Sequence, residues 1–228
     1  MHSNRKNELT KLYEASTHIF DFDGVIADTA RIKFEAFEQT LDSLYSDFRR
    51  SYGNALRSEL IGVGRSKVAG WVESHVKDAF LSKDWLNKFA DFLENRVLDV
   101  QAIPGAHEYI RRLSQSGKLN LIVSSAPRAD ILEALTKLEI PTDLFMFVHG
   151  VEAGSKTEVV DALIREKKLV PAECFFYGDM PSDARAAQNL GVRFIRIRSE
   201  PGRQMDFNGF PQPFFEIDDF NQWNEFFS

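Results

Sequence analysis

The sequence has few cysteines, no long apolar run and no excess of positive charge. Cys174 is the one cysteine among 228 residues. A single thiol excludes an internal disulfide and any metal site built from several thiolates, so we expect Cys174 to be a small buried hydrophobic residue. The longest uninterrupted apolar run covers residues 144–148, whereas a transmembrane helix needs about 20 such residues. We therefore expect no membrane-spanning helix.

The charge balance argues against a nucleic-acid-binding protein. Lys and Arg number 28 and Asp and Glu number 34, which gives a net charge of −6. Binding along a nucleic acid requires clustered basic residues, which this composition disfavours. The first 16 residues contain no apolar segment of the kind found in secretory signals. We therefore expect a cytoplasmic protein with no nucleic-acid or membrane partner. Whether it is a monomer or a homodimer is left open.

Short apolar runs alternate with helical patterns along most of the chain. The runs are mostly continuous rather than alternating, as is typical of strands covered on both faces. We expect strands at residues 17–20, 119–123, 145–148, 175–177, 194–197 and 214–217, and helices around 106–113, 131–138, 159–164 and 184–190. This order predicts an α/β fold, a doubly wound parallel-sheet Rossmann-like core with right-handed connections.

One long stretch interrupts the alternation. Apolar stripes with helical spacing occur near residues 30–44, 68–76 and 85–93, and no strand candidate stands out among them. We therefore expect residues 29–102 to form a helical module inserted after the first strand. The two remaining segments, residues 1–28 and 103–228, would then form the Rossmann-like core.

Polar residues follow the predicted strands at several points. In open parallel sheets, ligands bind beyond the carboxyl ends of the strands. The candidate site residues at these positions are, in chain order, Asp21, Asp23, Ser124, Ser125, Lys156, Asp179 and Asp183. They are far apart in the sequence, but the predicted topology would bring them to one edge of the sheet.

The acidic candidates indicate a metal site. Asp21 and Asp23 are two residues apart, so their side chains can point the same way along an extended chain. Like charges this close resist joint ionisation unless a cation joins them. Asp179 would add a third carboxylate from another strand. Three carboxylates without His or Cys ligands suit a hard cation such as Mg²⁺.

A hydroxyl and a cation indicate an anion site beside the metal. Ser124 follows a buried run and precedes a helix, where hydroxyl and backbone N–H groups can bind an anion. Lys156 begins the next helical pattern and could neutralise a phosphoryl oxygen. Each signal is weak alone, since such residues are usually a helix cap or a solvated charge. Their occurrence together, in order and at strand ends, favours the functional interpretation.

Taken together, these motifs resemble those of the haloacid dehalogenase-like hydrolases, in the subfamily with a helical cap inserted after the first strand. The four motifs read here as Asp21-Phe22-Asp23-Gly24-Val25, Ile122-Val123-Ser124, Lys156, and Gly178-Asp179-Met180-Pro181-Ser182-Asp183. The resemblance covers roughly residues 17–197. It implies that residues 29–102 are the cap and that the remainder is the catalytic core.

The resemblance also implies a role for each site residue. Asp21 would be the nucleophile that forms an aspartyl-phosphate, and Asp23 would be the general acid and base. Ser124, Ser125 and Lys156 would bind the phosphoryl group. The family thus implies a phosphatase acting on a small phosphorylated metabolite.

The implied cofactor is Mg²⁺. Its ligands would be Asp21, the backbone carbonyl of Asp23, and Asp179. Asp183 would either ligate the cation directly or orient the other groups. Because dehalogenases need no metal and lack the second Asp of the first motif, Asp23 together with Asp179 favours phosphoryl transfer.

Two alternatives to a phosphatase are open. Residues 23–30 and 60–65 resemble those of β-phosphoglucomutase, in which the cap Arg at the position of Arg65 binds a second phosphate, so a phosphomutase is the main alternative. Lys33 replaces a His of that mutase, and Thr157 follows Lys156 where the mutase usually has Pro, and these differences favour hydrolysis. The third possibility is a non-enzymatic phospho-acceptor like a response-regulator receiver domain, but such domains are typically about half this length and have no helical insertion.

Overall fold

The computed structural model describes residues 10–42, 70–72, 74, 79–96, 100–199 and 207–224. The helices and strands are, in chain order, β1 (Thr17–Phe20), α2 (Thr29–Asp42), α5 (Ala79–Arg96), α6 (Ala106–Gln115), β2 (Leu119–Val123), α7 (Arg128–Lys137), β3 (Phe147–His149), α8 (Lys156–Lys167), β4 (Cys174–Gly178), α9 (Pro181–Leu190), β5 (Arg193–Ile197), β6 (Phe215–Ile217) and α10 (Asn221–Asn224). Within these residues, three short 3₁₀ helices connect them, η2 (Thr142–Leu144), η3 (Val151–Ala153) and η4 (Pro171–Glu173).

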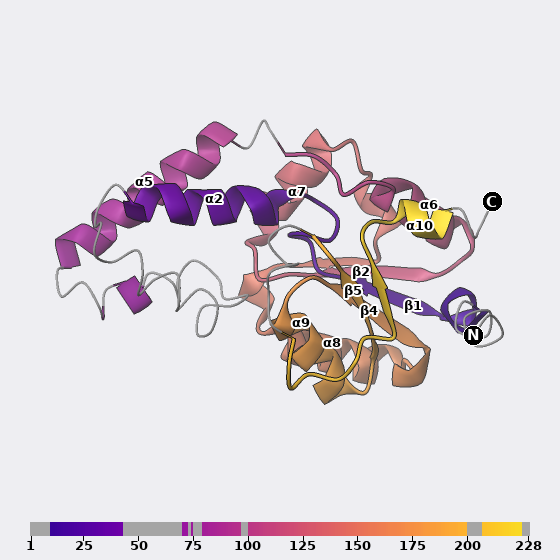
Figure 1. The fold of residues 1–228 in the computed structure, drawn as a ribbon. Helices are drawn as coiled ribbons and strands as arrows, with labels where there is room; N and C mark the ends of the chain where they lie inside the picture. Colours follow the sequence, from indigo (N-terminus) through magenta and orange to yellow (C-terminus); the bar gives the residue numbers. More distant parts are fainter. Residues whose placement is uncertain are drawn as a thin grey trace.

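The centre of the molecule is a six-stranded parallel sheet (Figure 1), with the strand order β3-β2-β1-β4-β5-β6. The first strand in the sequence is therefore a central strand of the sheet. Phe20 of β1 lies opposite Ile122 of β2 and Tyr177 of β4. This register brings the carboxyl ends of the three strands level, so the residues that follow them lie at one edge.

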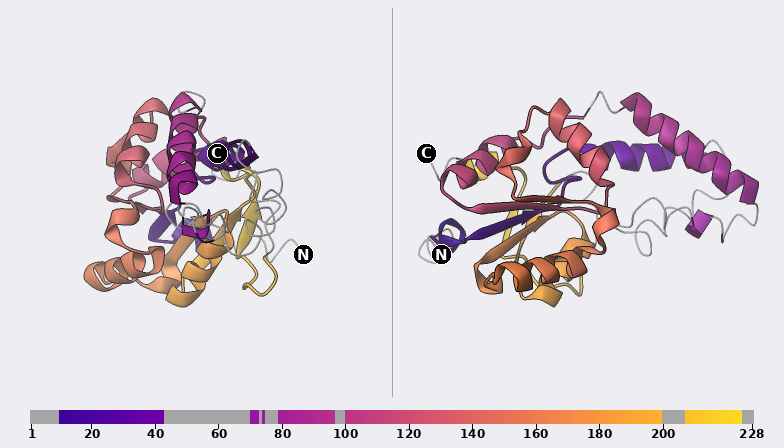
Figure 2. Two further views of the ribbon diagram at one scale, coloured as in Figure 1. Left: turned by 90° about the vertical axis from the view of Figure 1, so that its left-hand side faces the viewer. Right: turned by 180° about the vertical axis from the view of Figure 1, so that it is seen from behind.

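Helices cover both faces of the sheet (Figure 2), and the strand residues divide between two apolar cores. One core, under α6, α7 and α10, takes Phe20, Ile122 and Tyr177; the other, under α8 and α9, takes the alternate residues Ile19 and Phe176. Side chains alternate between faces along a strand, so a strand covered on both faces is apolar at most positions. This explains the continuous apolar runs of the sequence.

Helices α2 and α5 pack against each other and extend beyond the carboxyl end of the sheet (Figures 1 and 2). Trp85 of α5 is fully buried, and its indole N–H donates a hydrogen bond to the hydroxyl of Thr40 in α2 at 3.0 Å. A side-chain ion pair between Arg96 and Glu35 joins the two helices again at 3.1 Å. Most of the predicted stripe near 68–76 lies outside the described residues, so the division at 29–102 stays a prediction.

Most of the predicted elements are confirmed. The strands at 17–20 and 119–123 have the expected bounds, and all four core helices are present. Gly117 and Gly191 adopt positive φ angles of 73° and 66° where α6 and α9 end, as helix-stopping glycines do. Cys174 is buried as expected. None of the helices in the described part of the chain is long and apolar enough to cross a membrane.

The third predicted strand is wrong by two residues. We expected it at 145–148, but β3 covers Phe147–His149. Phe145 instead follows η2 and turns its ring into the core under α6 and α7. The apolar run Leu144–Val148 thus combines a core residue with a strand, which composition alone does not separate.

Candidate active site

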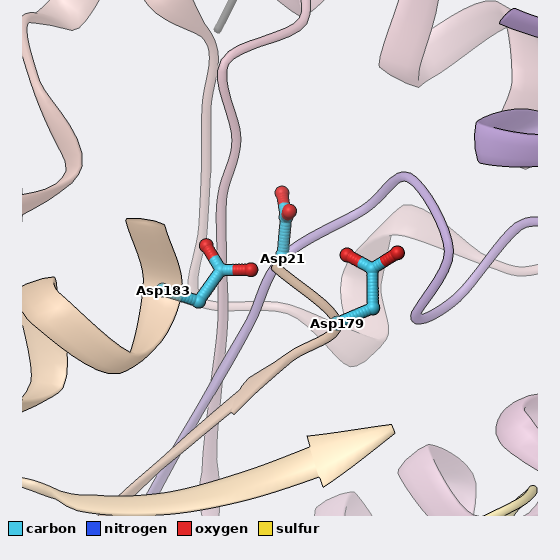
Figure 3. Close-up of side chains that lie close together, drawn as sticks. All are labelled: Asp21, Asp179 and Asp183. Atoms are coloured by element: carbon cyan, nitrogen blue, oxygen red, sulfur yellow. The ribbon is translucent and has the colours of Figure 1, made fainter. Parts of the chain in front are cut away.

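Three carboxylates from distant parts of the sequence meet at the carboxyl edge of the sheet (Figure 3). Asp21, Asp179 and Asp183 each place one oxygen so that all three lie within 4.8 Å of one another. Their residues are only 5%, 1% and 0% exposed. Asp21 follows β1 and Asp179 follows β4, and these strands are neighbours in the sheet. The fold therefore brings the first and fourth motifs together as expected.

Asp183 lies in the first turn of α9. Pro181 begins this helix three residues after β4 ends, and it has no N–H that would need a partner there. One carboxylate oxygen of Asp183 accepts a hydrogen bond from the Met180 backbone N–H at 3.0 Å. A Cβ atom at Gly178 would lie only 2.3 Å from the Cβ of Asp183. Glycine at this position is therefore what allows the helix to approach the strand so closely.

The carboxylate of Asp21 is held on both of its oxygens. Oδ1 accepts a hydrogen bond from the Phe22 backbone N–H at 2.7 Å. Oδ2 lies 2.7 Å from Nζ of Lys156, whose ammonium also lies 2.6 Å from Oδ1 of Asp183. Lys156 is the first residue of α8, and a capping box between Ser155 and Glu158 fixes this helix start. The predicted third motif therefore lies directly against the first.

The cluster is short of positive charge. Three carboxylates against one ammonium leave an excess of two negative charges when all are ionised. Burial, with added repulsion from Asp183 and Asp23, raises the pKa of Asp21 to about 6 although Lys156 opposes the shift. Burial, together with Asp183 and Asp21, also raises the pKa of Asp179 well above its usual range. Burial alone would lower the pKa of Lys156, but Asp183 and Asp21 raise it, so the ammonium stays charged.

These residues fit a divalent cation. The donors are carboxylate oxygens, the ligands that hard cations such as Mg²⁺ prefer. Oδ1 of Asp179 is buried and has no hydrogen-bond partner within the described residues. A buried carboxylate oxygen without a donor is costly unless a ligand satisfies it. The deficit of positive charge and the unpaired oxygen of Asp179 are therefore both consistent with a bound cation.

Asp23 is not one of the three clustered carboxylates, although its charge acts on Asp21. Its residue is half-buried, and its carboxylate accepts a hydrogen bond from the hydroxyl of Thr29, the first residue of α2. Gly24 follows it with a φ angle of 75°, and the backbone N–H groups of residues 25–27 fold back onto the carbonyl of Phe22. The chain thus leaves the extended conformation directly after Asp21. No side-chain oxygen of Asp23 belongs to the cluster.

The hydroxyl candidates lie at the same edge, after β2. Ser124 is buried, its backbone N–H donates to the carbonyl of His149 at 3.0 Å, and its hydroxyl accepts from the Ala126 N–H at 3.3 Å. Ser125 beside it is half-buried. Their roles in phosphate binding stay predictions. Arg65, the cap candidate, lies outside the described residues.

Sequence reasoning missed one residue of this region. The hydroxyl of Ser199 donates a hydrogen bond to Oδ2 of Asp179 at 2.7 Å, and both groups are buried. Ser199 follows β5, the neighbour of β4 in the sheet. The rule that selected the other candidates, a polar residue just after a strand, would also have selected it.

The sequence of this chain is similar to a family of hydrolases and to several of their relatives. The sequence profile described as "Haloacid dehalogenase-like hydrolase" matches residues 18–197. Protein CbbY of Rhodobacter capsulatus is 28% identical over 210 residues, which cover 86% of this chain and 90% of that protein. A phosphorylated carbohydrates phosphatase of Thermotoga maritima is 25% identical over 185 residues, which cover 78% and 82% of the two chains.

The fold has close counterparts among solved structures. A crystal structure described as a "predicted phosphoglycolate phosphatase" from Haemophilus somnus superimposes with a TM-score of 0.71. The match covers 94% of this chain and 99% of that one, at 16% identity. At this identity the likeness concerns the fold alone.

Proposed function

Because the chain belongs to the haloacid dehalogenase-like hydrolases, we propose that it is a Mg²⁺-dependent phosphatase that hydrolyses a small phosphorylated metabolite through an aspartyl-phosphate. The observation that carries this proposal is the environment of Asp21. Its carboxylate lies at the end of a central strand, fixed by Phe22 and Lys156, in a buried cluster that is short of two positive charges. The Thermotoga maritima relative is named for phosphorylated carbohydrates, which supports a substrate of this class.

Asp21 is the proposed nucleophile. One of its carboxylate oxygens forms a bond to phosphorus while the bond from phosphorus to the leaving oxygen breaks. Ser124, Ser125 and Lys156 would hold the other phosphoryl oxygens. Lys156 is well suited to this because it contacts Asp21 directly, and its raised pKa keeps it cationic. An anion that binds beside Asp21 therefore meets a fixed positive charge.

Asp23 is the proposed general acid and base. It would give its proton to the leaving oxygen in the first step and take a proton from the water that releases inorganic phosphate in the second. Its hydrogen bond from Thr29 ties its carboxyl group to the start of α2. Its carboxyl group is not a member of the acidic cluster, which suits this role, because a carboxyl group that binds a cation is a poor proton donor.

Asp21, Asp179 and the backbone carbonyl of Asp23 would hold Mg²⁺. Asp183 accepts hydrogen bonds from Met180 and Lys156, so we assign it to orienting Lys156. When bound, the cation supplies the positive charge that lets an anionic nucleophile approach an anionic phosphate.

We further propose that residues 29–102 act as the cap that the family resemblance implies. Its two connections to the core are paired with each other: the Asp28 N–H donates to the carbonyl of Gln101 at 2.8 Å, and the Ile103 N–H donates to the carbonyl of Ile26 at 2.9 Å. Paired connections suit a module that moves as a unit over the carboxyl edge of the sheet.

The test is phosphate release from a panel of sugar phosphates and other small phosphorylated metabolites, with Mg²⁺ or with a chelator. We expect metal-dependent release by the parent and none by Asp21→Asn. Asp161→Asn is the matched control, because Asp161 pairs with Arg165 on the exposed side of α8. Mass spectrometry of acid-quenched protein should find one phosphoryl group on the peptide that contains Asp21.

Other outcomes would replace this proposal. Formation of a phosphate isomer that depends on a bisphosphate activator, with little free phosphate, would identify a phosphomutase. A stable phospho-aspartate without turnover would identify a phospho-acceptor. Release of phosphate that persists in Asp21→Asn would show that Asp21 is not the nucleophile.

A further inference from the structure

We propose that Ser199 is a positioning residue that fixes the carboxylate of Asp179 so that one oxygen, Oδ1, stays available to the divalent cation. The inference rests on the proposed function, since it concerns the same cation site. Ser199 belongs to none of the four sequence motifs and follows β5, outside the segment 18–197 that the family profile matches.

The two oxygens of Asp179 have different surroundings. Oδ2 accepts the hydrogen bond from Ser199 at 2.7 Å, whereas Oδ1 is buried and has no partner in the described part of the chain. Ser199 is 6% exposed and Asp179 is 1% exposed, so water has little access to compete for either oxygen. The hydroxyl of Ser199 therefore determines which oxygen is left for a ligand.

The backbone of the first motif lies close to both Asp179 and Ser199. A Cβ atom at Gly24 would lie 2.2 Å from Oδ2 of Asp179 and 2.9 Å from the hydroxyl oxygen of Ser199. The backbone of Gly24 therefore packs against Asp179 and Ser199. It can come this close only because glycine has no side chain. The close backbone leaves Oδ2 of Asp179 and the hydroxyl of Ser199 little room to move.

Ser199 is itself held in place by the edge strand. The backbone N–H of Arg198 donates to the carbonyl of Ile217 in β6 at 2.8 Å, and its guanidinium donates to Asp218 at 2.9 Å. Ile197, the last residue of β5, is fully buried. The hydroxyl is therefore presented from a fixed segment, as positioning a metal ligand requires.

Removal of the hydroxyl should weaken cation binding. Without it, Oδ2 loses its donor, and the carboxylate can rotate and exchange its two oxygens. Loss of such an outer hydrogen bond typically costs about 10–100-fold in metal affinity. Turnover at saturating metal should change much less than the metal concentration needed for half-maximal rate, because Ser199 bonds to a proposed metal ligand and not to the proposed nucleophile.

The experiment measures Mn²⁺ binding directly, from the electron paramagnetic resonance signal of the free ion, with no substrate present. We expect Ser199→Ala to raise the dissociation constant about 10-fold or more. Ser199→Thr keeps the hydroxyl and should bind Mn²⁺ nearly as tightly as the parent. Ser16→Ala is the matched control, because Ser16 is half-buried just before β1, at the opposite edge of the sheet. Circular dichroism identifies any variant that fails to fold.

The outcomes separate this inference from the proposed function. Equal Mn²⁺ affinity of the parent and Ser199→Ala, while Asp179→Asn loses binding, would overturn the role of Ser199 and leave the cation site intact. Absence of Mn²⁺ binding by the folded parent would overturn the cation site and with it this inference. If Ser199→Ala does not fold, weak binding by folded Ser199→Thr, despite its hydroxyl, would contradict the proposal.

Discussion

Strands β1 and β4 contribute to two sets of buried polar side chains, one charged and one neutral. At their carboxyl ends, Asp21 and Asp179 belong to a charged cluster with an unpaired oxygen within the described residues. Earlier on the same strands, His18 Nδ1 and the hydroxyl of Tyr177 share a hydrogen bond of 2.7 Å. The Tyr177 hydroxyl shares a second one of 2.8 Å with Tyr109 of α6. All of these side chains are almost completely buried.

The second group is neutral, and its hydroxyls and His18 Nδ1 bond to one another, although Nε2 of His18 is buried without a hydrogen-bond partner among the described residues. Burial, helped by the positive charge of Lys118, lowers the pKa of His18 to about 3, so the imidazole is uncharged near neutral pH. Burial likewise raises the pKa of Tyr109 and Tyr177, so both phenols stay protonated. A neutral hydrogen-bonded network costs little to bury, whereas a cluster with excess negative charge lowers stability until a cation binds. The comparison therefore separates a structural network from a functional cluster on the same two strands.

The largest expected effect is on activity, from Asp21→Asn. Loss of the nucleophile should lower kcat by about 10³-fold or more. The same change removes one of three crowded carboxylates, so the thermal midpoint without metal should stay equal or rise. Steady-state kinetics and calorimetry on one preparation would check both parts. A strong fall in the thermal midpoint would mean that the acidic cluster stabilises the protein. The cluster would then not differ in this respect from the neutral network of His18, Tyr177 and Tyr109.

The next effect comes from Asp23→Asn. A general acid contributes about 10²–10⁴-fold to a rate, and the loss should depend on the leaving group. A nitrophenyl phosphate leaves without protonation, so its hydrolysis should suffer least, whereas a sugar phosphate should show the full loss. The ratio of kcat values for the two substrates, in parent and variant, measures this. An equal loss for both would remove Asp23 from the proton-transfer step.

Much of this arrangement can be predicted from the sequence. The continuous apolar runs give the parallel sheet, and the topology of such sheets places Asp21, Ser124 and Asp179 at one edge. Lys156 is found because it begins a helix at that edge. Local patterns suffice here because each residue lies at the end of a regular element.

The rest depends on contacts that local patterns do not encode. The link from Ser199 to Asp179 needs the three-dimensional register of β5 against β4, which the sequence alone does not give. The bond from His18 to Tyr177 joins groups 159 residues apart, which no local pattern indicates. An apolar ring suits a strand and a buried loop equally well, so the sequence does not show that Phe145 lies outside β3.

A smaller effect is expected in acid, where His18 should destabilise the protein. Its folded pKa lies below the unfolded value of 6.5, so the unfolded chain binds the proton more readily. The stability linked to neutral His18 is present above pH 6.5 and is lost as the pH falls towards about 3. Between about pH 7.5 and about pH 5 this amounts to about 2 kcal/mol.

The variant His18→Gln tests this, because an amide can still bond to Tyr177 but does not titrate. Denaturant unfolding at both pH values should show a smaller acid loss in the variant by about 2 kcal/mol. His107→Gln, the same change at a half-buried position on α6, is the matched control and should leave the parent's acid loss unchanged. An equal loss in parent and His18→Gln would contradict the assignment of a neutral buried imidazole.

The smallest effect is expected from Tyr109→Phe, which removes one hydroxyl from the neutral network. The ring keeps its packing, and Tyr177 keeps its bond to His18, so the loss should be about 1 kcal/mol of unfolding free energy. Because Tyr109 is on α6 and its hydroxyl bonds to Tyr177, which is not a catalytic candidate, kcat and the metal requirement should match the parent. Denaturant unfolding and kinetics on the same sample measure both. A large loss of activity with unchanged stability would show that the network extends its influence to the acidic cluster, and the two groups on β1 and β4 would then have to be treated as one.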